Sequence, residues 1–200
     1  MPAGRPQSLD LEAAMPVILR HFWHDGYAGA TIDQVAAELG VTKPTVYRAF
    51  GEKEAVFAAA LDTYHRAYIA PAEQHLEQAA TLRDALTGFF AVFVDRIVDD
   101  DLPAGCFLGD SAMTGTFTTG PIAATIDRLQ GRLGSLVQQR VEAAINGGEL
   151  EPATSVAAVV PFVLGQVSAL SAISRTGPTR SQLDSVVGYM LAGLPWVRTR

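Results

Sequence analysis

The sequence predicts an all-α protein of about nine helices, in which a three-helix N-terminal unit precedes a larger helical one. Apolar residues recur at helical spacing along most of the chain, and no stretch alternates apolar and polar residues as a half-buried strand does. Glycines and prolines stand where helices end and begin. With 200 residues, 48% of them hydrophobic, the chain can bury a real core. We place the unit boundary between residues 1–53 and 54–200.

The first helix is predicted from about Ser8 to His24, and Gly26 is its expected C-terminal breaker. Pro16 falls inside this range and removes one backbone hydrogen bond, so we expect it to kink the helix or delay its start. The apolar side of this helix comprises Leu11, Ala14, Ile18 and Phe22.

Two short helices follow, and both have clear start signals. Thr31 and Gln34 form a capping-box pattern, and Gly40 is the expected end of that helix. Thr42 is the expected N-cap of the next helix, which Gly51 terminates. The pattern is therefore two capped helices on either side of a tight turn.

A longer helix is predicted from Glu52 to a break near Pro71, because apolar residues from Phe57 to Tyr68 keep helical spacing. Pro121, Pro152 and Pro178 stand where first-turn prolines are tolerated. The remaining helices are predicted at about 82–98, 103–116, 121–146, 153–174 and 179–194.

The formal net charge of −6 repels nucleic acid at long range, so any affinity for DNA must come from a local patch. No acidic residue lies between Glu38 and Glu52, and Lys43 and Arg48 fall in that window. Ala36, Gly40 and Val46 suit the crossing and turn of a helix pair. The outward face, which can meet a major groove, then consists of Thr42, Lys43, Thr45, Tyr47 and Arg48.

These residues resemble the TetR family of transcription regulators. The match is carried by Gly26-Tyr27, Thr31-Ile32, Val41-Thr42-Lys43-Pro44-Thr45-Val46-Tyr47 and Phe50-Gly51-Glu52-Lys53-Glu54. It covers about residues 8–68 strongly, and the remainder in helix count and order. The resemblance implies a homodimeric, ligand-responsive regulator, commonly a repressor, that binds a palindromic double-stranded operator through the N-terminal unit.

Carried over to this chain, the family pattern assigns Thr42, Lys43, Pro44 and Thr45 to base edges. It assigns Tyr47, Arg48 and Lys53 mainly to phosphates, a division that suits their chemistry. Thr31 completes the expected DNA-binding set. The segment Gly4-Arg5-Pro6 is either a basic arm that enters an adjacent minor groove or a disordered terminus.

Residues 81–117 are rich in large apolar side chains, which either fill a core or line a cavity. The resemblance implies an effector cavity among these middle helices. The candidate lining residues are Phe93, Cys106, Phe107, Met113 and Phe117. Cys106, expected near a helix N-terminus, is either a thiol sensor or an inert buried residue.

The segment from Pro152 to Ser174 has no charged residue, yet Pro161, Gly165 and Gln166 interrupt it, which disfavours a membrane span. A helix that is apolar all round must be buried all round, and a second copy of the chain can cover it. We therefore expect a homodimer interface built from helices 153–174 and 179–194. Its expected residues are Phe162, Val163, Gln166, Val167, Leu170, Val187, Met190 and Leu191.

Catalytic, metal and cofactor sites are not predicted. Gly109-Asp110-Ser111 resembles a hydrolase elbow, but Met113 stands where the last glycine belongs. The single cysteine fits a reducing cytoplasm. The alternative function is a helical small-molecule-binding or interaction protein of the same fold without DNA binding, which the acidic net charge favours.

Overall fold

The computed structural model describes residues 9–197, and the secondary structure of this range consists of helices joined by turns and loops, as predicted. Within this range the β-type hydrogen bonding consists of one isolated antiparallel bridge between Leu150 and Trp196. The α-helices are α1 (Leu11–Gly29), α2 (Ile32–Glu38), α3 (Lys43–Phe50), α4 (Lys53–Tyr64), α5 (Ala70–Gln78), α6 (Leu82–Ile97), α7 (Phe107–Met113), α8 (Gly120–Asn146), α9 (Val156–Ser174) and α10 (Arg180–Ala192), with a π-helical segment η1 (His65–Ile69).

Helix α1 begins at Leu11 because the Asp10 carboxylate accepts hydrogen bonds from the next backbone amides, those of Glu12 and Ala13. The predicted start, Ser8, lies outside the described residues, as does the segment 4–6. Of the two effects expected of Pro16, the kink is absent, and the helix begins before this proline, at Leu11. The interruption falls at Gly26, whose φ of 68° and ψ of 179° are non-helical, and helical geometry resumes to Gly29.

Helices α2 and α3 have the predicted caps. Gln34 N donates to Thr31 Oγ1 at 3.2 Å, and Thr31 N donates to Gln34 Oε1 at 3.0 Å, which is the capping box. Thr42 is the N-cap of α3 by position, but its hydroxyl lies 3.0 Å from Thr45 Oγ1 and does not bond an amide.

The predicted break near Pro71 is wrong, because the chain stays helical from Lys53 to Gln78 through α4, η1 and α5. Ala70 N donates to His65 O, a π-type bond that inserts one extra residue into the turn. Pro71, which lacks an N–H, then falls in the first turn of α5, where the missing donor is tolerated. If α4, η1 and α5 are counted as one continuous helix, the described residues form nine helices.

Helix α7 is shorter than the predicted range of 103–116. Gly105 has a φ of 91° and Gly115 a φ of 62°, so these two left-handed residues bound the helical turns between them. The other predicted ranges agree with α6, α8, α9 and α10 to within three residues.

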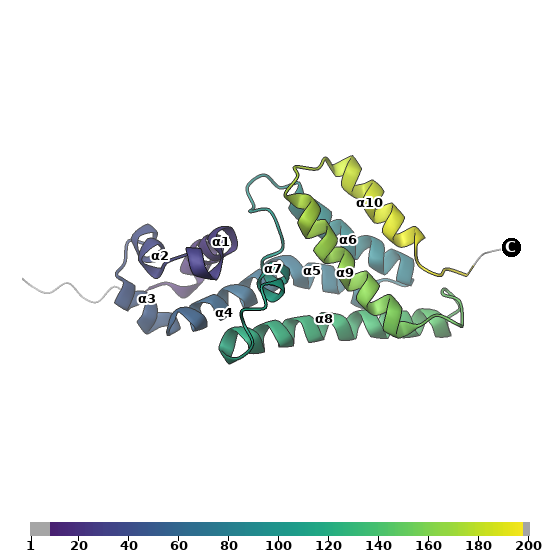
Figure 1. The fold of residues 1–200 in the computed structure, drawn as a ribbon, viewed down its shortest axis with the longest axis horizontal. Coiled ribbons are helices and arrows are strands. Elements are labelled where there is room, and N and C mark those ends of the chain that lie inside the picture. The colour runs from purple at the N-terminus through teal and green to yellow at the C-terminus, as the bar shows by residue number, and fades with distance from the viewer. Residues whose placement is uncertain (1–8, 198–200) are drawn as a thin grey trace, which may run out of the picture.

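Helices α1, α2 and α3 lie at one end of the molecule, which we call the head, and α4 leads from them toward the remaining helices, the body (Figure 1). Helix α5 packs against α6, and α8 packs against α4, α5 and α9. Rings from both units meet around Phe57 of α4, which contacts Phe22 at 4.9 Å and Phe107 at 5.0 Å between ring centroids. This aromatic junction connects the head to the body.

Candidate DNA-binding surface and cavities

The helix pair α2–α3 presents the predicted polar face to solvent. Val41 N donates to Ala36 O at 2.9 Å across the turn, and Val35 and Val46 are fully buried between the helices. With those side chains inward, Thr42 and Arg48 are exposed on the opposite side of α3. Of the other predicted DNA-binding residues, Thr31 and Pro44 are exposed, and Lys43, Thr45, Tyr47 and Lys53 are half-buried.

Lys43 is held by a neighbour that sequence reasoning missed. Its Nζ lies 2.9 Å from Asp33 Oδ2 on α2, and this hydrogen bond raises the pKa of Lys43. The ammonium also lies 5.8 Å from the centroid of the Tyr47 ring. Asp33 and Lys43 are ten residues apart, so only the crossing of the two helices brings them together.

Lys53 extends the positive surface to the start of α4. Its Nζ lies over the Tyr27 ring at 4.7 Å from the centroid. Burial, and then the charge of Lys43, lower the pKa of Lys53, so the two cations lie close enough to interact. Tyr27 was missed as a site residue, although it belongs to the Gly26-Tyr27 motif.

The orientation of α2 against α1 depends on Glu38. Its carboxylate pairs with Arg20 and, at 2.7 Å, with His21 Nε2. Arg20 is therefore engaged in an ion pair between α1 and α2, as Lys43 is between α2 and α3.

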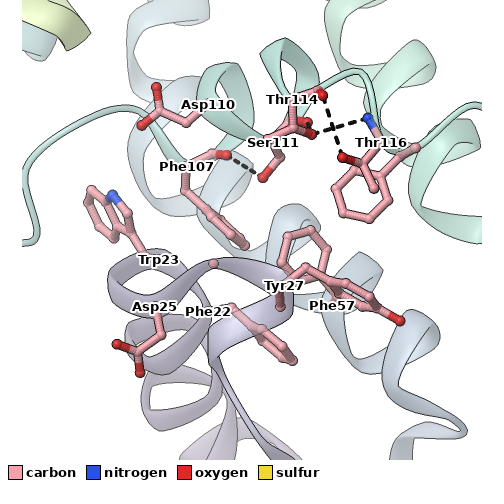
Figure 2. Close-up of a pocket in the computed structure, with 13 residues that line it drawn as sticks. Phe22, Trp23, Asp25, Tyr27, Phe57, Phe107, Asp110, Ser111, Thr114 and Thr116 are labelled. Carbon is pink, nitrogen blue, oxygen red and sulfur yellow. Dashed lines mark hydrogen bonds between the residues drawn. The ribbon is translucent and has the colours of Figure 1, made fainter.

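A cavity of about 280 Å³ lies at the aromatic junction, and we call it the junction cavity (Figure 2). Phe107 and Phe117, two of the predicted ligand residues, line it together with Trp23, Tyr27 and Phe57. A second space of about 350 Å³, the body cavity, lies among η1, α6, α7, α8 and α9. Phe93 and Cys106 line that one.

The predicted ligand residues therefore divide between two cavities, and Met113 lines neither of them. Its side chain is 73% exposed at the end of α7, so its assignment as a ligand residue was wrong. Cys106 is the N-cap of α7 and is 3% exposed. Its Sγ accepts from Tyr64 Oη at 3.5 Å and from Gly109 N at 3.4 Å.

The expected interface residues separate into buried and accessible sets. Packing against α6, α8 and α10 of the same chain buries one face of α9. Those contacts leave Val163 and Leu170 1% and 0% exposed, so the expectation that they face a partner was wrong. Phe162 is 39% exposed, and Gln166 and Val167 are half-buried. On α10, Val187, Met190 and Leu191 also pack within the chain, whereas Tyr189 is 81% exposed.

Among the described residues, one helix, α9, is long and apolar enough to cross a membrane, with a mean hydropathy of 2.0. Only 22% of its apolar window is buried in the single chain. Length and composition alone are weak evidence for a span, because interface helices and core helices meet the same criterion.

Comparisons with known proteins agree with this architecture. Residues 15–60 match the family of bacterial regulatory proteins named after TetR, and residues 83–189 match the tetracyclin repressor-like C-terminal domain. The HTH-type transcriptional repressor ComR of Escherichia coli (strain K12) is 28% identical over 94% of this chain and 90% of its own length.

A solved structure of a cysteine mutant of the TetR family regulator CifR, complexed with 26bp double-strand operator DNA, is 26% identical. It superposes with a TM-score of 0.85 over 96% of this chain and 100% of that one. A TetR regulator of Chloroflexus aurantiacus has the same fold, with a TM-score of 0.78 at 20% identity over 90% of this chain and 91% of its own. The chain belongs to the TetR family of DNA-binding transcription regulators.

Proposed function

We propose that this protein is a repressor that binds a palindromic operator in the cytoplasm as a homodimer and responds to a small-molecule effector. The observation that carries the proposal is the exposed, acid-poor outer face of α3, flanked by the start of α4. Thr42, Lys43 and Thr45 lie at the first turn of α3, the part of a recognition helix that reaches base edges. Arg48 and Lys53 lie beside it, where they suit phosphates.

Helix geometry supports the same assignment. The N-terminus of α4, at Lys53, has no side-chain cap, so its backbone amides can face an anion. Because the bulk charge of the chain is negative, these local groups must supply the attraction to DNA. The affinity should therefore fall steeply as salt rises.

The experiment is selection of bound duplexes from a random pool, followed by fluorescence anisotropy on the selected sequence at several salt concentrations. Lys43→Ala should weaken specific binding by about 5- to 100-fold, the range for one base contact. Arg48→Ala and Lys53→Ala should each reduce the salt slope by about 0.9 per lost phosphate contact. Arg66→Ala removes an equal charge from η1, outside the head, and is the matched control.

If no duplex is selected at low salt, the chain is instead the ligand-binding protein without DNA binding that its acidic charge favours. Equal effects of Arg66→Ala and Arg48→Ala would show that bulk charge, and not the surface of α3, governs the binding.

The accessible face of α9 is the proposed site at which a second copy of the chain packs. Four of its exposed residues follow the i, i+3, i+4, i+7 pattern of one helix face and form an apolar stripe: Ala158, Pro161, Phe162 and Gly165. Open space surrounds Gly165 on α9 and Gly188 on α10, so a partner helix can approach these backbones closely. A two-fold pairing of α9 and α10 would cover the stripe and set the spacing of two heads.

The body cavity is the proposed effector site. It is lined mainly by apolar side chains from the central helices, with Gln130 and Ser168 as polar groups, which suits a small organic molecule. Cys106 borders it, so its thiol is either a contact for the effector or part of the packing. Loss of the effector response in Cys106→Ser would distinguish these two roles.

A further inference from the structure

We propose that the junction cavity is a second ligand site, which takes a small, neutral, mostly apolar molecule with one hydrogen-bond acceptor. It lies between α1 of the head and α7 of the body, with α4 between them, and is separate from the body cavity. The lining residues of the two cavities do not overlap.

The walls of the junction cavity are chiefly aromatic. Figure 2 shows the side chains of Phe107, Tyr27 and Phe57 close to one another in the lining. Six rings line it in all, from Phe22, Trp23, Tyr27, Phe57, Phe107 and Phe117. A volume of about 280 Å³ and apolar walls fit a compact ring system with a short substituent.

The indole N–H of Trp23 is the hydrogen-bond donor that would bind the acceptor of the ligand. Trp23 is 8% exposed, and its Nε1 finds no hydrogen-bond acceptor among the described residues. Figure 2 shows the indole on the side of the cavity nearest Phe107 and Asp110, with its nitrogen turned toward α7. Buried indole N–H groups ordinarily have a partner, so a ligand oxygen is the natural complement here.

The serine, threonine and aspartate side chains of the lining already have partners. Ser111 Oγ donates to Phe107 O at 2.7 Å, and Thr114 Oγ1 donates to Ser111 O at 2.9 Å. Asp110 accepts from Arg175 at 2.5 Å, while Asp25 pairs with His24 at 2.7 Å.

Asp110 is paired with Arg175, Asp25 is hydrogen-bonded to His24, and none of the described lysines and arginines lines the cavity. An anionic ligand would meet no free cation there, and a cationic one would have to compete for paired carboxylates. A neutral ligand with an acceptor oxygen fits the unmet donor and the apolar walls together.

The position of the cavity gives such a ligand a regulatory consequence. One wall is the end of α1 at residues 22–28, and the other is α7 with the segment up to Phe117. An occupant therefore contacts head and body at once and restricts their relative angle. This consequence rests on the proposed function, whereas binding to the cavity does not.

The test is isothermal titration calorimetry of the full-length protein, without DNA, using acetophenone as the probe and α-methylstyrene as the isostere that lacks the acceptor. We expect acetophenone to bind about 3- to 10-fold more tightly, the ratio that one hydrogen bond contributes. Trp23→Phe should abolish that ratio by weakening acetophenone alone. Trp196→Phe, whose Nε1 donates to Leu191 O at 2.6 Å, is the matched control and should leave the ratio unchanged.

Two further variants locate the probe without disturbing the core. Thr114→Trp places a ring over the mouth of the junction cavity from an exposed position and should weaken acetophenone at least about 10-fold, since the ring would exclude it. Leu164→Trp narrows the body cavity and should leave acetophenone binding intact.

The proposal is overturned if Leu164→Trp removes binding, if Trp23→Phe keeps the ratio, or if no neutral probe binds at millimolar concentration. Tighter binding of benzoate or benzyltrimethylammonium would overturn the neutral class of ligand. Because these titrations contain no DNA, their failure is distinguishable from failure of operator binding.

Discussion

Asp33 Oδ2 lies 2.9 Å from Lys43 Nζ, so an acid of α2 holds the leading base of the recognition helix in the free protein. The Asp33 side chain is 69% exposed and the Lys43 side chain 41% exposed, so the pair is accessible to water. In the proposed complex, Lys43 would exchange this carboxylate for a base edge or a phosphate. We therefore expect the ion pair to orient Lys43 in the free protein and to oppose DNA binding.

Asp33→Asn is expected to raise operator affinity by about two- to fivefold, because the competing partner of Lys43 loses its charge. Anisotropy titration against the selected duplex measures the change. Asp62→Asn, which frees Arg128 on the body from its 2.6 Å partner, removes the same charge away from the head and should leave the affinity unchanged. Weaker binding by Asp33→Asn would mean that orientation of Lys43 matters more than its release.

Phe162→Arg is expected to dissociate the proposed dimer, because a charge would replace an apolar side chain at the centre of the α9 stripe. Sedimentation equilibrium should give twice the chain mass for the wild type and the single chain mass for the variant. Met113→Arg also replaces an exposed apolar residue, on α7, and should remain dimeric. A monomeric wild type at micromolar concentration would refute the interface.

Glu73 is a buried acid of α5 that ties three elements together. It is 2% exposed and accepts from His65 Nε2 at 3.0 Å and from Arg132 Nε at 2.8 Å. Burial by itself raises the pKa of Glu73, but these two hydrogen bonds outweigh it, so the pKa is lowered. Glu73→Gln should cost about 1.5–3 kcal/mol in the free energy of unfolding at pH 7, measured by urea titration.

The pH dependence follows from the direction of that shift. A lowered pKa in the folded state gives stability that is fully present above the unfolded-state pKa of about 4.3 and is lost as the pH falls through the lower folded value. The difference between wild type and Glu73→Gln should therefore shrink below about pH 4.3. Glu77→Gln, whose 42%-exposed carboxylate pairs with the same Arg132 at 3.2 Å, should show a much smaller difference at every pH.

Gly105→Ala tests the turn that carries Cys106 into the body cavity. At its φ of 91°, an added Cβ would lie 2.4 Å from Asp110 Oδ2 and 2.7 Å from an Arg175 nitrogen. The substitution should lower the free energy of unfolding by about 1–2 kcal/mol for the left-handed backbone and by about 1–3 kcal/mol more for the contact. Gly115→Ala shares the positive φ but meets nothing within 4 Å, so it should show the backbone effect alone.

Local signals in the amino-acid sequence predict much of the head. Thr31 with Gln34, and the glycines at 40 and 51, determine helix ends through contacts within a few residues, and the capping box is present as predicted. The π segment was missed because helical periodicity does not distinguish an inserted residue from a break at Pro71. The exposure of Met113 and the presence of two separate cavities were missed, because residues that line a cavity and residues that fill a core have the same apolar composition.

The sequence by itself determined the helical class and the outward polar face of α3, because periodicity, caps and the spacing of Ala36 and Val46 are properties of adjacent turns. Only the tertiary structure decided that Asp33 engages Lys43, that Val163 faces inward while Phe162 faces outward, and that Trp23 lies beside α7. Those relations depend on how separate helices cross, and the crossing is set by the packing of whole faces over long stretches of chain.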